Sequence, residues 1–300
     1  MIIQTPIKCP ELIMKYVLEA IAKREQKPFV ACDFSPPKAG TEDLLTNIAE
    51  LTPDMFLVAY APGKSVRINS IFVADWIQTQ VNIPSIFTIS PRDMNKNAIQ
   101  SLLLGAQLRE LDNVFIVKGD KFSIQDLVLQ NAVDDFKPTE LVASIRSMNE
   151  RRDFLGKELY YPTTFCIGAA LDISRSWKNE AWLTKLKIEQ GCDFLISQPV
   201  FEPELPDRFL EFYRGEIGEN LNVPILWGIQ MVDKNTVSFA TVPEWVHRKL
   251  EDGYLPYEIA INLIGRYLEK GLDTFYLIPT IFKGGRRDYL SAQAVIEEIK

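Results

Sequence analysis

Eight short apolar runs recur along the chain, and their recurrence limits the possible folds more than any other feature. Each run is almost continuously apolar rather than alternating, which is typical of strands covered on both faces. Successive runs start roughly 27–31 residues apart, except for longer gaps after 113 and 223. The runs are PFVACDF (28–34), MFLVAY (55–60), PSIFTI (84–89), NVFIVKG (113–119), TFCIGAAL (164–171), CDFLIS (192–197), VPILWGI (223–229) and DTFYLI (273–278).

Helical patterns lie between these runs. Apolar residues follow a spacing of about 3.6 in the stretches 67–80, 95–111 and 179–191. In EQGCDFLI and EKGLDTFYLI a glycine follows the helix, where it fits the left-handed conformation that ends a helix. Eight strands with helical connections predict an α/β fold, a (β/α)8 TIM barrel forming a single domain over residues 1–300.

The two long gaps predict additional helices within 120–160 and 231–262.

An open doubly wound sheet is the alternative architecture. It gives no reason for eight such units, and no GxGxxG motif follows the first strand.

Composition excludes several classes of function. The 33 basic and 40 acidic residues give a net charge of −7, which argues against nucleic acid as the main partner. No apolar run reaches 18 residues, so we expect no transmembrane helix. The start of the chain lacks a basic segment followed by an apolar stretch, so we expect no secretory signal and a cytoplasmic protein.

The cysteines and the histidine narrow the chemistry further. Cys9, Cys32, Cys166 and Cys192 form no CxxC pair and are predicted to be buried, reduced thiols. The single histidine, His247, excludes a His-rich zinc site and any Ser–His or Cys–His dyad built elsewhere. We expect it to be solvated or to cap a helix end, and we expect no metal site.

Active sites of (β/α)8 barrels form at the C-terminal ends of the strands, so polar residues there are the candidates. They supply carboxylates, amides and a lysine, which suit proton donation and recognition of a heterocycle by hydrogen bonds rather than metal-assisted hydrolysis. The candidates are Asp33, Tyr60, Thr88, Ser90, Lys118, Asp120, Asp172, Gln198 and Gln230.

Asp33 is the most informative of these residues. It ends an apolar run, and Pro36 and Pro37 then force an exposed turn. A carboxyl group in an apolar barrel mouth has its pKa raised by desolvation, as a general acid near neutral pH requires. Alternatively, Asp33 caps the next helix or pairs with Lys38.

Four motifs together resemble the methylenetetrahydrofolate reductase family. DFSPPK is similar to the family's (E)-x-x-P-P-(K/R), and SPRDMNKNAIQSLLLGAQLRELDNVFIVKGD is similar to its R-D-x-N…G-D block. DFLISQPVFE and PILWGIQMV resemble the two later motifs, in the same order, so the resemblance covers about residues 28–232. It implies reduction of 5,10-methylene-tetrahydrofolate, or of a related tetrahydropterin, to the 5-methyl form.

The resemblance also implies roles for single residues. Asp33 matches the family's acid, usually Glu, that promotes opening of the methylene-bridged ring. Asp120 and Gln198 match residues that hydrogen-bond the pterin, and Phe239 falls where an aromatic side chain stacks on the p-aminobenzoyl group. The implied cofactors are FAD and NAD(P)H, the latter as electron donor. The implied cofactor-binding positions are Tyr60, Thr88, Lys118, Gly119, Asp120, Ala169 and Lys187.

Three basic residues have alternative interpretations. Lys187 is either a cation near the flavin phosphates or an exposed helix lysine. Arg286 and Arg287 either pair with an anionic glutamyl tail or cofactor phosphate, or belong to a solvated turn.

The chain departs from the family pattern at three places. Ile86 stands near the family's histidine, Lys118 replaces an arginine, and residues 171–176 replace a Tyr-Pro-Glu-x-His-Pro stretch. Several of these family residues contact flavin. A flavin-independent reductase, a folate-binding methyltransferase component and a catalytically degenerate partner subunit of a one-carbon complex therefore stay open. A homo-oligomer is also compatible with the sequence.

Overall fold

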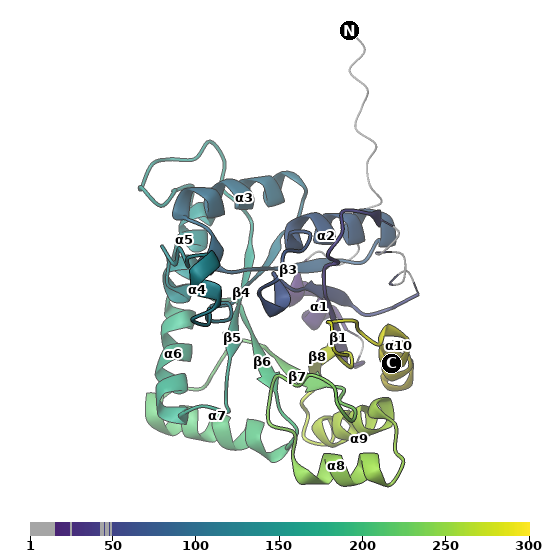
Figure 1. Cartoon of the computed structure of the whole chain (residues 1–300). Helices are drawn as coiled ribbons and strands as arrows, with labels where there is room; N and C mark the ends of the chain where they lie inside the picture. The colour runs from purple at the N-terminus through teal and green to yellow at the C-terminus, as the bar shows by residue number, and fades with distance from the viewer. Residues whose placement is uncertain (1–15, 25, 43–44, 46–47, 49) are drawn as a thin grey trace.

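Eight parallel strands close into a barrel in chain order, with β1 pairing both β2 and β8 (Figure 1). The computed structural model describes residues 16–24, 26–42, 45, 48 and 50–300. All eight predicted strands and the (β/α)8 architecture are confirmed. The strands are β1 (Phe29–Phe34), β2 (Met55–Val58), β3 (Ser85–Ile89), β4 (Asn113–Ile116), β5 (Cys166–Leu171), β6 (Phe194–Pro199), β7 (Ile225–Gln230) and β8 (Thr274–Ile278).

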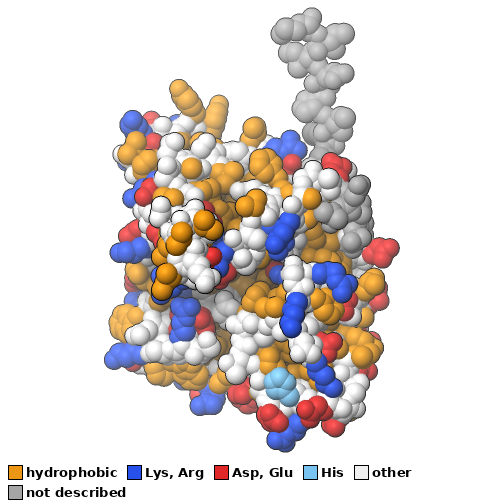
Figure 2. All heavy atoms as spheres, in the orientation of Figure 1, with side chains coloured by type: hydrophobic (Ala, Val, Ile, Leu, Met, Phe, Trp, Pro, Cys, Tyr) orange, Lys and Arg blue, Asp and Glu red, His pale blue; other side chains and the backbone are white. Residues whose placement is uncertain are grey.

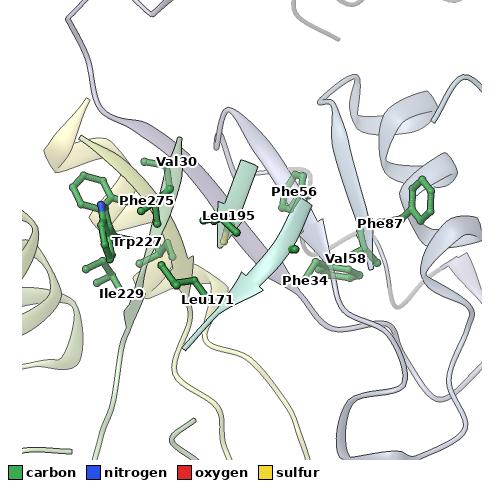
Figure 3. Packing of buried hydrophobic residues seen from close by; sticks show 14 of the residues in the cluster. Val30, Phe34, Phe56, Val58, Phe87, Leu171, Leu195, Trp227, Ile229 and Phe275 are labelled. Atoms are coloured by element: carbon green, nitrogen blue, oxygen red, sulfur yellow. The ribbon is translucent and has the colours of Figure 1, made fainter. Parts of the chain in front are cut away.

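The strands are apolar on both faces because alternate residues enter two separate cores. One core lies between the strands and the surrounding helices, where Val30, Phe56 and Trp227 pack (Figure 3). The other fills the inside of the barrel and includes Phe29 and Phe194. A Cβ atom on Gly168 would lie 2.3 Å from the Phe194 ring, so this glycine makes room for the ring. Side chains thus fill the barrel interior below its mouth. A ligand can therefore bind at the mouth and not inside the barrel.

The predicted helical stretches form helices around the barrel. The stretch 67–80 contains α2 (Ser70–Trp76), which runs into a π-helical turn at Ile77–Val81. The stretches 95–111 and 179–191 contain α3 (Lys96–Leu108) and α6 (Trp177–Glu189). Gly191 and Gly271 have φ values of 98° and 75°, which confirms the predicted left-handed helix ends.

The two long gaps hold the extra helices that were expected. The first gap contains α4 (Asp126–Leu129) and α5 (Pro138–Asn149), and the second contains α8 (Glu244–Glu251) and α9 (Pro256–Leu268). The remaining helices are α1 (Val17–Lys23), α7 (Glu204–Ile217) and α10 (Tyr289–Ile299).

Helix α1 closes the N-terminal end of the barrel. The backbone N–H of Val17 donates to Asn113 Oδ1 at 3.0 Å, and Val17 and Ala20 pack with the residues inside the barrel. The N-terminal end of the barrel is therefore covered. The predicted polar residues lie at the opposite, C-terminal end, which is the open mouth.

Three cysteines lie within the two cores. Cys32, Cys166 and Cys192 are buried and unpaired, as predicted, whereas Cys9 lies outside the described residues. Desolvation raises the pKa of all three thiols, in the case of Cys192 to about 12. Their chemistry is therefore that of small apolar core residues.

Candidate active site at the barrel mouth

A cavity at the mouth has a volume of about 490 Å³ and is called here the Gln198 cavity. Gln198 reaches it from the end of β6 and Phe239 from the loop after β7, so the structure brings together two predicted substrate-binding residues. Among the described residues that line it, Glu202 is the one charged side chain. The lining residues are Ile173, Ser174, Gln198, Pro199, Val200, Phe201, Glu202, Leu205, Ser238, Phe239, Ala240, Thr241 and Pro243.

A close approach of two strands places Gln198. The register between β6 and β7 shifts after Ile196, so that Pro199 lies opposite Gly228. A Cβ atom on Gly228 would lie 2.7 Å from the Ser197 carbonyl oxygen, so this position needs glycine. Ser197 Oγ accepts the Gly228 N–H at 2.8 Å and donates to the Gln198 carbonyl at 2.8 Å. These contacts fix the backbone that presents the Gln198 amide.

A smaller cavity, called here the Lys118 cavity, has a volume of about 230 Å³. Gly119 adopts φ +81°, and a Cβ atom there would lie 2.5 Å from Ser90 Oγ, so glycine is required on both counts. The lining residues are Arg92, Lys118, Gly119, Asp120, Lys121, Phe122, Leu127, Ala132 and Asp134.

Arg92 organises the Lys118 cavity, although we did not predict it as a site residue. Its Nη1 donates to the Asp120 carbonyl at 3.0 Å, and its guanidinium lies 4.6 Å from the centre of the Phe122 ring. The side chain is 6% exposed and is paired with Asp93. The available signal was the sequence PRD directly after the third apolar run. It places an arginine beside a carboxylate at a strand end, and a buried arginine requires such a fixed partner.

Helix α4 forms part of the rim of the Lys118 cavity. It carries the exposed side chains of Leu127, Val128 and Leu129, and Figure 2 shows apolar atoms grouped over this helix. An ion pair between Lys64 and Asp126 ties the helix to the loop after β2. The rim is therefore apolar on its outer side and held by one ionic contact to a neighbouring loop.

Tyr60 and Thr88 lie at the ends of the neighbouring strands β2 and β3. The Tyr60 hydroxyl is hydrogen-bonded to Asp93, and desolvation together with that carboxylate raises the Tyr60 pKa to about 12. Thr88 is on the same face of β3 as Ile86, which packs inside the barrel. Its hydroxyl is buried and has no hydrogen-bond partner among the described residues. Such an unmet polar group suits a ligand with a polar edge.

Asp33 lies inside the barrel mouth with both carboxylate oxygens bonded. Tyr276 Oη donates to Oδ1 at 2.8 Å, and Arg287 Nε donates to Oδ2 at 2.9 Å. The Asp33 and Arg287 side chains are 2% and 4% exposed. The alternative pairing with Lys38 is therefore wrong. The reading of Arg287 as part of a solvated turn is also wrong, because the residue is buried against Asp33.

Arg286 and Tyr276 complete this part of the mouth. The Arg286 guanidinium lies 4.4 Å from the centre of the Phe282 ring rather than in the buried pair. Desolvation and the Asp33 carboxylate raise the pKa of Tyr276 well above its ordinary value, so this phenol stays a hydrogen-bond donor at neutral pH.

Two predicted cofactor residues do not face the mouth. Lys187 is buried, and its Nζ bonds to the Ala170 carbonyl at 2.6 Å and to Glu180 Oε1 at 3.1 Å. It is neither an exposed helix lysine nor a cation available to a phosphate. Ala169 packs in the core between strands and helices, because alternation along β5 directs Gly168 and Ala170 inward instead.

The single histidine lies away from the residues that line the two cavities. His247 is exposed on α8 (pale blue in Figure 2). Within residues 16–24, 26–42, 45, 48 and 50–300, no group of three or more His, Cys, Asp or Glu side chains could hold a metal ion. No helix in those ranges has the length and apolar character needed to cross a bilayer.

Comparison with known proteins decides the family. The family model described as methylenetetrahydrofolate reductase matches residues 17–269, which is most of the chain. The chain belongs to the methylenetetrahydrofolate reductase family. Within this family it is 24% identical over 222 residues to methylenetetrahydrofolate reductase 2 of Schizosaccharomyces pombe, and 23% identical over 224 residues to methylenetetrahydrofolate reductase 1 of the same yeast. These alignments cover 68% and 69% of this chain but 33% and 34% of the yeast proteins, so the chain spans about a third of their length.

Solved structures share the fold of this family member. An uncharacterized Clostridium thermocellum protein that binds two copies of 5-methyl-5,6,7,8-tetrahydrofolic acid matches with a TM-score of 0.64 at 17% identity. That match covers 95% of this chain and 99% of the other. The long-chain alkane monooxygenase LadA matches with a TM-score of 0.53 at 9% identity, over 92% of this chain and 91% of the other. At these identities the likeness shows the barrel fold alone.

Proposed function

We propose that this member of the methylenetetrahydrofolate reductase family binds a tetrahydrofolate-type carrier in the Gln198 cavity and reduces its 5,10-methylene group to a 5-methyl group. The observation that carries the proposal is the meeting of Gln198 and Phe239 in one cavity. A primary amide offers a donor and an acceptor to a pterin edge, and a half-exposed aromatic ring offers a surface for stacking.

The carrier's bonding explains why an acid is needed. The reacting carbon bridges N5 and N10 of the carrier. Protonation of N10 breaks its bond to that carbon and leaves an iminium at N5, to which a hydride adds to give the methyl group. Asp33 is the proposed proton donor, and it must leave its pair with Arg287 and carry a proton to act.

The proposed flavin would lie along the ends of β2, β3 and β4. The unpaired Thr88 hydroxyl, the Tyr60 hydroxyl and the Lys118–Asp120 segment would hold it, along neighbouring strand ends. Bound FAD would supply the hydride, after reduction by NAD(P)H. Lys187 and Ala169 take no part in this arrangement, because one is buried in an ion pair and the other faces the helices.

The Asp33–Arg287 pair favours a second candidate function. An acid held by a guanidinium and a phenol is poorly placed to donate a proton, so the chain would bind methyltetrahydrofolate without reducing a methylene group. The Clostridium protein of the same fold binds 5-methyl-5,6,7,8-tetrahydrofolic acid, which makes this ligand the natural probe for the second candidate. In one-carbon metabolism such a protein would serve as a methyltransferase component or a partner subunit.

One set of measurements on the purified chain separates the two. The reductase predicts a flavin absorbance band, or an NAD(P)H-dependent turnover of methylene-tetrahydrofolate without one. The binding protein predicts saturable binding of 5-methyltetrahydrofolate with no turnover under any donor. A chain that neither binds the methyl form nor turns over the methylene form would contradict both.

A further inference from the structure

The side-chain amide of Gln230, at the end of β7, makes three hydrogen bonds within the protein. Its Nε2 donates to the Val237 carbonyl at 2.8 Å, and its Oε1 accepts the Phe239 N–H at 2.9 Å and the Ser238 hydroxyl at 3.3 Å. The residue is 3% exposed. The amide thus bonds one carbonyl and the N–H two residues later, much as a neighbouring parallel strand would.

The segment that Gln230 holds forms one wall of the Gln198 cavity. Ser238, Phe239 and Ala240 line that cavity, whereas Gln230 itself does not. Phe239 is 48% exposed, although its backbone N–H is bonded to the buried Gln230 amide. An exposed aromatic side chain on a hydrogen-bonded backbone is typical of a surface that binds a flat ligand.

The same segment is tied to the loop after β8. The Val237 N–H donates to the Ile281 carbonyl at 2.9 Å, and Ile281 forms bridges with both Val237 and Arg287. Arg287 bonds in turn to Asp33. Gln230 therefore supports a continuous set of contacts from the aromatic wall of the cavity to the buried acid.

From these contacts we infer that Gln230 is a positioning residue, which fixes Phe239 in the wall of the Gln198 cavity and so sets affinity for the aromatic part of the carrier. The inference rests on the proposed function for the identity of the ligand. The position of Phe239 itself can be tested without any ligand.

The chain offers a matched control in Gln100 on α3. Gln100 is 5% exposed, its Nε2 donates to Ser144 Oγ at 2.9 Å, and its Oε1 accepts the Phe154 N–H at 3.0 Å. At nearly constant volume, Gln100→Met removes two amide contacts and Gln230→Met removes three. Gln230→Glu retains the acceptor for Phe239 and loses the donor to Val237. A general loss of stability would appear in both methionine variants. A loss of cavity geometry would appear in Gln230→Met alone.

The first measurement is hydrogen exchange at the Phe239 backbone amide in the unliganded protein. We expect faster exchange in Gln230→Met than in the wild type, intermediate exchange in Gln230→Glu and no change in Gln100→Met. Unchanged exchange at Phe239 in Gln230→Met would overturn the inference, whether or not the chain binds a folate.

The second measurement is a double-mutant cycle with 5-methyltetrahydrofolate as the titrant. Gln230→Met and Phe239→Ala should each weaken binding by about tenfold, and the double variant should be no weaker than the weaker single variant. Additive losses, or an equal loss in Gln100→Met, would contradict the inference. If the wild type binds no methyltetrahydrofolate while exchange behaves as expected, the proposed function fails and the positioning role stands.

Discussion

Arg287 Nε and Asp33 Oδ2 lie 2.9 Å apart, although the two residues are 254 positions apart in the sequence. The pair joins the end of the first strand to the loop after the last strand, across the seam at which the barrel closes. Because both side chains are almost completely buried, each charge depends on the other. The pair therefore bears on stability and on the proposed chemistry at once.

The Asp33–Arg287 pair should contribute strongly to the free energy of unfolding. Arg287→Met leaves the buried Asp33 carboxylate without its cation, and we expect unfolding in urea to become easier by about 3–5 kcal/mol. Asp33→Asn should have a similar effect. The double variant Asp33→Asn/Arg287→Met should recover much of that loss, because neither charge is left alone. Losses that simply add would show that the two residues do not act as a pair.

Asp33 should also control chemistry if the chain is a reductase. We expect Asp33→Asn to reduce methylene turnover by at least about a hundredfold, the scale of a lost general acid, while binding of the pterin is largely retained. Turnover and the dissociation constant are measured on the same folded sample. Turnover equal to that of the wild type would remove the acid role.

Eight strands were predictable because burial on both faces makes each strand a continuous apolar run, as in 192–197 and 223–229. The proximity of Gln198 and Phe239 could also be predicted, since the C-terminal ends of all strands lie at one end of a barrel. The partner of Asp33 was not, because a loop conformation selects Arg287 from 254 residues away. Nor could spacing show that Lys187 pairs with Glu180, because helical periodicity does not tell a buried polar face from an exposed one.

Thr88→Val should separate stability from cofactor binding. The variant removes a buried hydroxyl that lacks a partner among the described residues, so we expect equal or greater stability. If that hydroxyl serves the flavin, FAD affinity should nevertheless fall. Thr184 on α6 is the control, since its buried hydroxyl also has no partner among the residues described. Thr184→Val should leave FAD affinity unchanged, and an unchanged FAD affinity in Thr88→Val would dismiss the proposed contact.

Gly228 should tolerate no side chain. A Cβ atom there would lie 2.7 Å from the Ser197 carbonyl, so Gly228→Ala must displace the backbone that presents Gln198. We expect a loss of about 1–3 kcal/mol in unfolding free energy and weaker binding of methyltetrahydrofolate. Gly215 on α7 has open space at its Cβ position, and Gly215→Ala should be neutral or slightly stabilising. Equal behaviour of the two variants would refute the close approach.

Stability should fall in alkaline solution because of the buried thiols. The pKa of Cys192 is raised from 9.0 to about 12, and burial also raises the pKa of Cys32 and Cys166. Above pH 9 the unfolded chain therefore loses protons that the folded chain keeps, which favours unfolding as the pH rises. Below that range these thiols contribute no pH dependence. Urea midpoints between pH 8 and 10 measure the slope, and Cys192→Ala should make it shallower. A slope that is the same in this variant would place its origin elsewhere.

Titration of the purified chain with 5-methyltetrahydrofolate, beside Gln198→Ala, addresses the binding site most directly. We expect saturable binding to the wild type and a loss of roughly 1–3 kcal/mol in the variant, because the amide partners of the pterin are removed from a partly buried position. Absence of binding to the wild type, or an identical dissociation constant in Gln198→Ala, would contradict the assignment of this cavity to a one-carbon carrier.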